Sequence, residues 1–258
     1  MIRTELQAIY VMWIRQMKRF IRSKSRIVGM IVQPLFFLFI LGGGLRSASL
    51  PGMESNDYLV FIAPGIITMA ILFSSIFTGI SVLWDRQFGF LQEVLVAPIS
   101  RFSIIFGRTL GGATTALIQG FIILIIALGV GVQIHSVAGL FLTIVFMILT
   151  AFTAVGIGLM IASKMTDFQG FQIIMNLVIL PLFFLSSAIF PIATNPNLPD
   201  FIITASFFNP LFFMVDGMRG SLTGSSNYFD PLLNLVIVFF ICIIIMFIGG
   251  YLFSKSEA

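Results

Sequence analysis

The chain has 258 residues, of which 59% are hydrophobic and only 9% are charged. A soluble domain carries roughly 25% charged residues, so this composition excludes an ordinary soluble protein and predicts an integral membrane protein. The net charge of +4 is small and the single cysteine, Cys242, lies in an apolar run, which excludes an intrachain disulfide.

Residues 1–26 carry an amphipathic helical pattern. Apolar side chains recur at steps of three and four residues, whereas most basic side chains lie off that stripe. The stripe comprises Leu6, Ile9, Tyr10, Trp13, Met17, Phe20 and Ile21. A basic helix with aromatic residues on its other face is typical of the membrane headgroup plane. A calmodulin target would look similar, but an apolar span follows directly, which favours an interfacial helix.

Six apolar segments follow, each close to the roughly 20 residues that cross a hydrocarbon core. They cover residues 27–45, 58–84, 109–134, 137–163, 168–190 and 231–253. The sequence therefore predicts an all-α polytopic membrane protein that forms a single transmembrane domain over residues 1–258. Six spans place both termini on the same side of the membrane.

The basic residues indicate which side this is. Of the 14 Lys and Arg residues, only Arg46 and Arg219 fall on the side opposite the termini. The positive-inside rule therefore predicts cytoplasmic termini in a multi-pass protein of the plasma (cytoplasmic) membrane. It also explains the basic excess by topology, so we do not expect nucleic-acid binding.

The connector at residues 85–108 lies on the same predicted side and is unusually apolar for a loop. It carries five charged residues, yet bulky apolar groups dominate residues 88–96, and the pattern predicts a short helix that ends near Pro98. Residue types alone slightly favour a helix that rests on the membrane surface. The alternative is a helix that fills a groove on a cytoplasmic partner.

Residues 191–219 do not fit a simple outer loop. The segment contains four prolines and two apolar runs, each too short to cross a bilayer. Asn209 can cap a helix whose first turn begins with Pro210. We predict two re-entrant half-helices between the fifth and sixth spans, ahead of an ordinary interfacial loop.

No catalytic or metal-binding constellation is present in the sequence, and no GxxxxGK[ST] loop for nucleotide phosphates. The spans carry no central charge of the kind that ion-coupled transporters use, which argues against a secondary transporter or channel. The amides of Gln33, Gln119, Gln172 and Asn176 are more often interhelical partners than substrate contacts. Gly107 and Gly111 suit close helix packing.

An ordered set of motifs along almost the whole chain resembles the permease subunits of ABC transporters of the type-2 exporter class. The motifs are the basic start before Gln33-Pro34-Leu35, residues 58–65 (YLVFIAPG), residues 89–95 (GFLQEVL), residues 97–101 (APISR), Phe190-Pro191, Leu198-Pro199, and Asn209-Pro210 followed by Asp216 and Arg219. One departure is Phe90-Leu91-Gln92-Glu93, where many relatives have a Thr-Leu-Glu run.

This resemblance implies a dimer, most simply a homodimer, that binds two cytoplasmic ABC ATPase subunits and exports an amphiphilic drug-like, lipid or glycan substrate. ATP and Mg would be held by the partner ATPase, and no cofactor by this chain. A polysaccharide or glycolipid exporter of the same family is the alternative. The coupling residues would be Phe88, Leu91, Glu93, Val94, Leu95 and Arg101. The pathway lining would include Gln33, Tyr58 and Asn176, and the re-entrant segment would contribute Pro191, Asn209, Pro210, Asp216 and Arg219.

Overall fold

The computed structural model describes residues 2–47, 51, 53, 57–89, 99–225 and 228–256. Throughout these residues the regular secondary structure is helical, which confirms the all-α prediction. Four helices are long and apolar enough to cross a membrane on their own. They are α3 (Tyr58–Gln87), α5 (Arg101–Val130), α6 (Val137–Lys164) and α10 (Pro231–Ser256).

The remaining helices are shorter or broken. The amphipathic helix α1 (Ile2–Arg22) leads into α2 (Lys24–Phe37), and α2 continues as a π-helical stretch, η1 (Leu38–Gly43). The axis bends by 72° between α1 and this second segment. Helix α7 (Phe168–Phe184) is apolar but only 17 residues long.

The two short helices predicted within residues 191–219 are present as α8 (Asp200–Phe207) and α9 (Pro210–Thr223). They meet at an angle of 83°. Asn209 caps α9 by accepting a hydrogen bond from the Leu211 amide, and Pro210 occupies the first turn, as the sequence predicts. The Asn209 side chain also donates to the Leu182 carbonyl over 2.6 Å, which ties the break to the end of α7.

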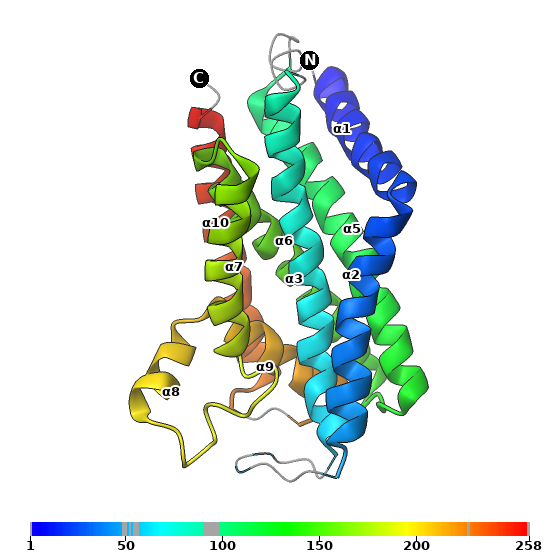
Figure 1. The fold of residues 1–258 in the computed structure, drawn as a ribbon, viewed down its shortest axis with the longest axis vertical. Helices are drawn as coiled ribbons and strands as arrows, with labels where there is room; N and C mark the ends of the chain where they lie inside the picture. Colours follow the sequence, from blue (N-terminus) through cyan, green and yellow to red (C-terminus); the bar gives the residue numbers. More distant parts are fainter. Residues whose placement is uncertain are drawn as a thin grey trace.

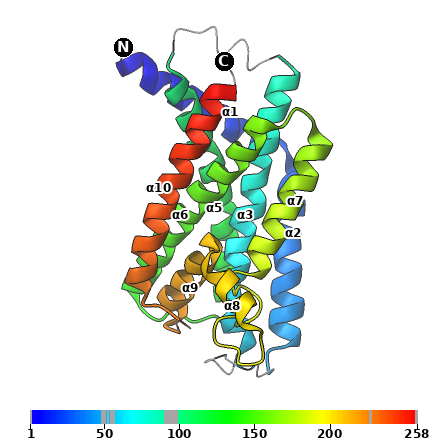
Figure 2. The same ribbon diagram turned by 90° about the vertical axis from the view of Figure 1, so that its left-hand side faces the viewer.

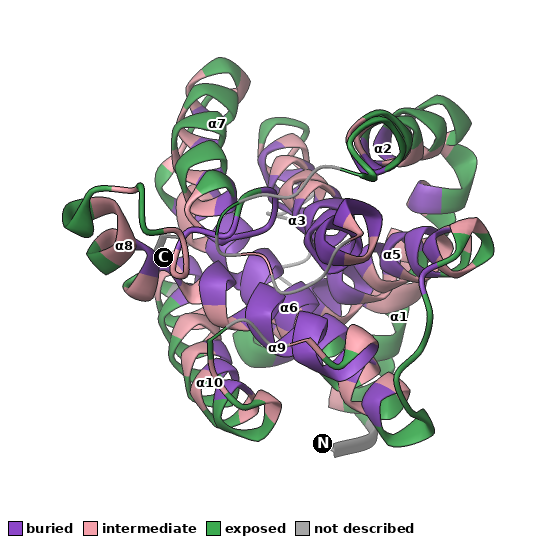
Figure 3. Ribbon diagram, turned by 90° about the horizontal axis from the view of Figure 1, so that it is seen from below, coloured by how far each residue is buried: buried purple, intermediate pink, exposed green. Residues whose placement is uncertain are grey.

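The long helices run side by side, with both chain termini at one end of the bundle (Figure 1). We call this the terminal end, and the opposite end, which carries α8 and α9, the distal end (Figure 2). Viewed from the distal end, the buried residues gather along α3, α6 and α9, whereas α2, α7 and α10 carry much of the exposed surface (Figure 3). Large apolar side chains dominate that outer surface, as a lipid-facing bundle requires.

The structure differs from the predicted connector at both of its ends. Helix α3 continues to Gln87 and α5 begins at Arg101, so Asp85 and Arg108 lie within helices. Both side chains are buried, with 4% and 1% of their surface exposed. The described residues between the two helices are 88, 89, 99 and 100.

Candidate functional site

The residues predicted to contact an ATPase flank the gap between α3 and α5. Phe88 caps α3 and leaves 81% of its surface exposed, and Arg101 is the exposed first residue of α5. The other predicted coupling residues, Leu91, Glu93, Val94 and Leu95, lie outside the described residues. The structure therefore shows how the ends of the connector are held.

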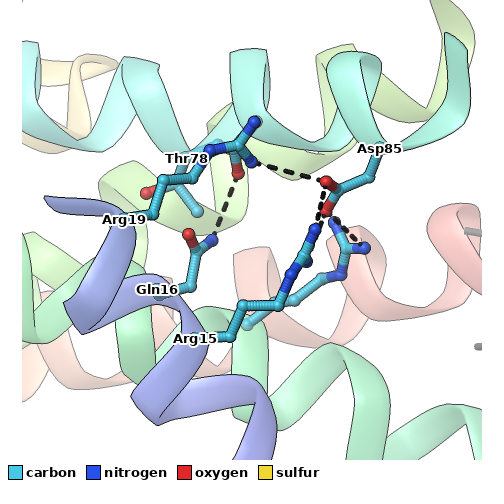
Figure 4. A network of polar contacts seen from close by, with 7 residues as sticks. Arg15, Gln16, Arg19, Thr78 and Asp85 are labelled. Carbon is cyan, nitrogen blue, oxygen red and sulfur yellow. Dashed lines mark hydrogen bonds and ion pairs between the residues drawn. The ribbon is translucent and has the colours of Figure 1, made fainter. Parts of the chain in front are cut away.

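The first end is held by a cluster of charges around Asp85 (Figure 4). Arg15 of α1 donates two hydrogen bonds to the two carboxylate oxygens, over 2.8 and 2.6 Å. Arg108 of α5 approaches the same carboxylate at 2.9 Å, and Arg19 of α1 approaches it at 3.4 Å. Bidentate guanidinium–carboxylate pairs are among the strongest hydrogen-bonded contacts in proteins, so this cluster joins α1, α3 and α5.

Burial makes these contacts unequal. Arg108 and Asp85 are almost completely buried, whereas about a third of the Arg15 side chain (32%) and 27% of the Arg19 side chain remain exposed. A charge removed from water needs a nearby opposite charge far more than a hydrated one does. Loss of the Asp85–Arg108 pair should therefore reduce the stability of the folded protein more than loss of either exposed arginine. Gln16 extends the network by donating to the Ser81 hydroxyl over 3.1 Å.

The second end of the connector is held by the first turns of α1. Ser100 caps α5, its hydroxyl accepting a hydrogen bond from the Ser103 amide. The Glu5 carboxylate accepts from the Ser100 amide at 3.0 Å and from the Ser100 hydroxyl at 2.8 Å. Side-chain hydrogen bonds from Ser103 and then Ser100 lower the pKa of Glu5, so Glu5 favours the charged form that binds here.

Helix α1 can reach both ends because it packs closely along α5. A Cβ atom added at Gly107 would lie 2.8 Å from the Met12 Cβ, and one at Gly111 would lie 2.6 Å from the Gln16 Cβ. Trp13 also donates to the Thr114 hydroxyl over 3.1 Å. Gly107 and Gly111, which the sequence singles out, thus allow the backbones of α1 and α5 to approach each other closely. We call α1 with its contacts at Asp85 and Ser100 the connector clamp.

The same end of α3 is joined to the turn between α6 and α7. Arg86 donates to the Met165 carbonyl over 3.0 Å. The Trp84 ring packs edge-on against Phe168 at 5.9 Å, and the Arg19 guanidinium lies 5.0 Å above the Trp84 ring. A displacement of the connector would therefore act on α1, α3, α5 and the start of α7 together.

A half-open groove of about 650 Å³ runs between α2, α3 and α7. Its lining residues are Gly29, Met30, Gln33, Phe73, Ile76, Phe77, Ile80, Trp84, Phe168, Gln172, Met175 and Asn176. It contains two of the three predicted pathway residues, Gln33 and Asn176. The third, Tyr58, is buried elsewhere, and its hydroxyl donates to the Ile189 carbonyl over 2.9 Å.

The groove is confined to the terminal half of the bundle. Every α3 residue from Phe61 to Leu72 is buried, and the α3 residues that line the groove begin at Phe73. On α2 and α7 the lining residues likewise come from the turns nearest the terminal end. The distal half of α3 is thus buried by its neighbours and does not line the groove.

At the distal end a buried arginine holds this packing together. Arg219 of α9 is fully buried and donates to the Phe61 carbonyl over 3.1 Å and to the Ser187 carbonyl over 2.7 Å. Its guanidinium also lies 4.0 Å above the Phe61 ring. Ser187 adopts a left-handed conformation (φ 61°), and Pro191 is buried in the same segment. The predicted residue Asp216, also buried, accepts hydrogen bonds from the Phe229 amide and the Asn234 side chain.

Across the described part of the chain, no group of three or more His, Cys, Asp and Glu residues is placed to hold a metal ion. Three other features stand out: the connector clamp, a groove in the terminal half of the helical bundle, and a distal half in which α3 is buried. Together they define a polytopic membrane protein of the transport type.

Comparison with known proteins identifies the family. Residues 7–223 match the family described as ABC-2 type transporter, and the chain belongs to it. It is 27% identical to a putative transport permease ycf38 of Cyanophora paradoxa, over 97% of this chain and 89% of the relative. It is also 28% identical to the inner membrane transport permease YadH of Escherichia coli (85% and 84% covered) and 26% identical to a nodulation protein J of Rhizobium leguminosarum (78% and 75%).

The chain is accordingly a membrane transport permease of an ABC system, of a family that normally works with an ATPase partner.

Proposed function

We propose that this chain is the membrane subunit of an ATP-driven exporter, in which a separate ATPase docks on the connector between α3 and α5. The observation that carries the proposal is the connector clamp, because α1 binds immediately before the connector at Asp85 and immediately after it at Ser100. A loop that only rests on lipid does not need both of its ends fixed to one helix. A loop that transmits force from a partner needs fixed ends, because otherwise its movement would not reach the helices.

The clamp gives the force a route into the bundle. Arg15 joins α1 to the end of α3, and Arg108 joins α5 to the same carboxylate. Movement of the docked connector would thus move α1, α3 and α5 as one unit. The groove borders α3, so its shape would change with that movement.

The groove also favours export as the direction. We place both termini, and hence the terminal end of the bundle, in the cytoplasm because 12 of the 14 basic residues lie on that side. The groove then opens at the level of the inner leaflet, while the buried residues of α3 close the outer half. An amphiphile would enter from the cytoplasmic side and leave when the distal packing around Arg219 opens. The pathway would be completed by a second copy of the chain, facing the same groove.

A polysaccharide or glycolipid exporter of the same family is the second candidate, because such exporters share this architecture and a similar chain length. It shares the clamp, the dimer and the ATPase with the first candidate and differs only in the substrate.

Affinity purification of the tagged full-length chain from native membranes tests the proposal. An ABC ATPase should co-purify in equal amount, and light scattering should give two copies of each subunit. An unrelated polytopic protein purified in the same detergent is the control. A monomeric chain that brings no ATPase with it would contradict the proposal.

A further inference from the structure

The groove between α2, α3 and α7 has a lining that restricts what it can bind. None of its 12 lining residues carries a charge. Aromatic, methionine and aliphatic side chains form most of the lining, and its polar side-chain groups are three amides and the indole N–H of Trp84. Gln33 lies on the α2 wall, and Gln172 and Asn176 lie on the α7 wall, one helical turn apart and therefore on one face.

Among the described residues, these three amides have no hydrogen-bond partner. Within the part of the chain that the structure describes, none of the three bonds to another residue, and all three are exposed to the groove or its rim. Gln119 behaves differently, since it is buried and donates to the Met30 sulfur over 3.0 Å. In a bilayer an amide without a partner is unfavourable, because the lipid chains offer no hydrogen bonds. A polar group from a bound molecule would therefore stabilise the three amides, since no described residue of this chain pairs with them.

We infer that the groove binds an uncharged amphiphile whose hydroxyl, carbonyl or amide groups pair with Gln33, Gln172 and Asn176. Each amide is both a donor and an acceptor, which suits hydroxyl-rich or amide-rich molecules. The apolar part of the ligand would lie on Phe73, Phe77 and the other apolar lining groups. This inference rests on the proposed function, since it names the class of substrate that the groove takes.

An ionic headgroup fits the groove poorly. A charge moved out of water needs an opposite charge or several strong hydrogen bonds, and the lining offers no charge. Arg19 lies over the Trp84 ring at the terminal rim, but its guanidinium is already paired with Asp85. The volume of about 650 Å³ is that of a site for a drug-sized molecule.

The chain contains a reporter for this groove. Of its two tryptophans, Trp84 lines the groove, and Trp13 lies on α1. In a Trp13→Phe protein reconstituted into lipid vesicles, which add no tryptophan, the remaining tryptophan fluorescence comes from Trp84 alone. Three probes that share an octyl chain, below their micellar concentrations, separate the headgroups: octyl β-D-glucoside, octyl sulfate and octyltrimethylammonium. We expect the glucoside to change Trp84 emission saturably at the lowest concentration. Equal responses to the three headgroups, or no saturation, would overturn the inference.

Variants then locate the binding. Gln172→Leu with Asn176→Leu should weaken glucoside binding by about tenfold, because two hydrogen bonds are lost. Gln169→Leu lies on the same helix outside the groove and should leave binding unchanged. Unchanged binding in the double variant overturns the inference. If binding is unchanged while light scattering shows that the dimer is lost, the amides serve the second copy of the chain instead.

The measurement needs neither ATP nor an ATPase. Failure of the proposed function, with no ATPase recruited, would therefore leave a positive probe result intact. A negative probe result beside a functional ATPase complex would remove the substrate class alone.

Discussion

Replacing Asp85 by asparagine removes one negative charge from the cluster that joins α1, α3 and α5, with almost no change in shape. The carboxylate accepts from Arg15 and faces Arg108 at 2.9 Å, and Arg108 is 1% exposed. Removing one partner of a buried ion pair destabilises a protein by about 3–5 kcal/mol. We expect about 3 kcal/mol, the lower end of this range, because asparagine keeps one acceptor oxygen and because the partly exposed Arg15 and Arg19 regain water.

The loss of stability is measured by heating the detergent-solubilised full-length chain to a series of temperatures. Size-exclusion chromatography then gives the fraction of protein that remains folded at each temperature. For a protein of this size, about 3 kcal/mol corresponds to a fall in the unfolding midpoint of about 10 °C. Asp57→Asn is the matched control, because Asp57 pairs with Arg46 in a partly exposed ion pair and asparagine can still accept the Leu59 amide hydrogen bond that caps α3. Such a pair contributes about 0–1 kcal/mol, so this variant should shift the midpoint by at most a few degrees.

A second variant separates the charge effect from general damage. Replacing both partners, as Asp85→Leu with Arg108→Met, leaves no buried charge at the position and should recover much of the stability that Asp85→Leu alone loses. The reasoning is refuted if Asp85→Asn shifts the midpoint no more than Asp57→Asn does. It is also refuted if the double variant is less stable than Asp85→Leu, since Asp85 would then act through something other than its pairing with Arg108.

Three further changes probe other parts of the structure. Gly107→Leu should separate α1 from α5 and so speed trypsin cleavage of the basic α1. Gly129→Leu is the control, because a Cβ atom there meets no neighbour. Equal cleavage of the two variants would contradict the close packing of α1 on α5. Arg219→Met removes two hydrogen bonds to backbone carbonyls and should lower the stability by about 2–3 kcal/mol in the thermal assay, and an unchanged midpoint would rule out a distal lock. In a cysteine-free background, Gln87→Cys should react with an impermeant maleimide only from the cytoplasmic side and Gln133→Cys only from outside. Labelling of Gln87→Cys from outside would contradict the predicted topology.

The architecture follows largely from local sequence patterns. The apolar runs predict helices that can cross a membrane, and Asn209-Pro210 marks the start of α9 because capping and a fixed proline φ both act within one turn. Gly107 and Gly111 signal a close helix contact, although the sequence did not indicate that the neighbour is α1.

The clamp could not be predicted, because it depends on pairs that are far apart in the chain. Asp85 and Arg108 appear in the sequence as charges at the two ends of a connector outside the membrane, which suggests that both are exposed to water. They are buried because Arg15, 70 residues from Asp85, arrives on α1 and shares the carboxylate. The contact between Glu5 and Ser100 spans 95 residues. No local pattern records such separations.

The groove could be predicted from the sequence only in part. The spacing of Gln172 and Asn176 places both on one face of a helix, which a reader of the sequence can see. That Gln33 lies on the opposite wall depends on the arrangement of α2 and α7 around α3, which is a tertiary property. Gln119, of the same residue type, became an interhelical partner instead.

The central claim is that the connector between α3 and α5 docks an ATPase. Co-purification of the ATPase with a Leu91→Asp/Leu95→Asp variant tests it most directly, because two charges would face an apolar groove of the partner. Val137→Asp is the control, since Val137 is 73% exposed at the opposite end of the bundle. We predict that the double variant inserts into the membrane at the normal level but brings down no ATPase, whereas the control retains it. Undiminished co-purification and ATP hydrolysis with the double variant would mean that the connector rests on the bilayer and that the ATPase binds elsewhere.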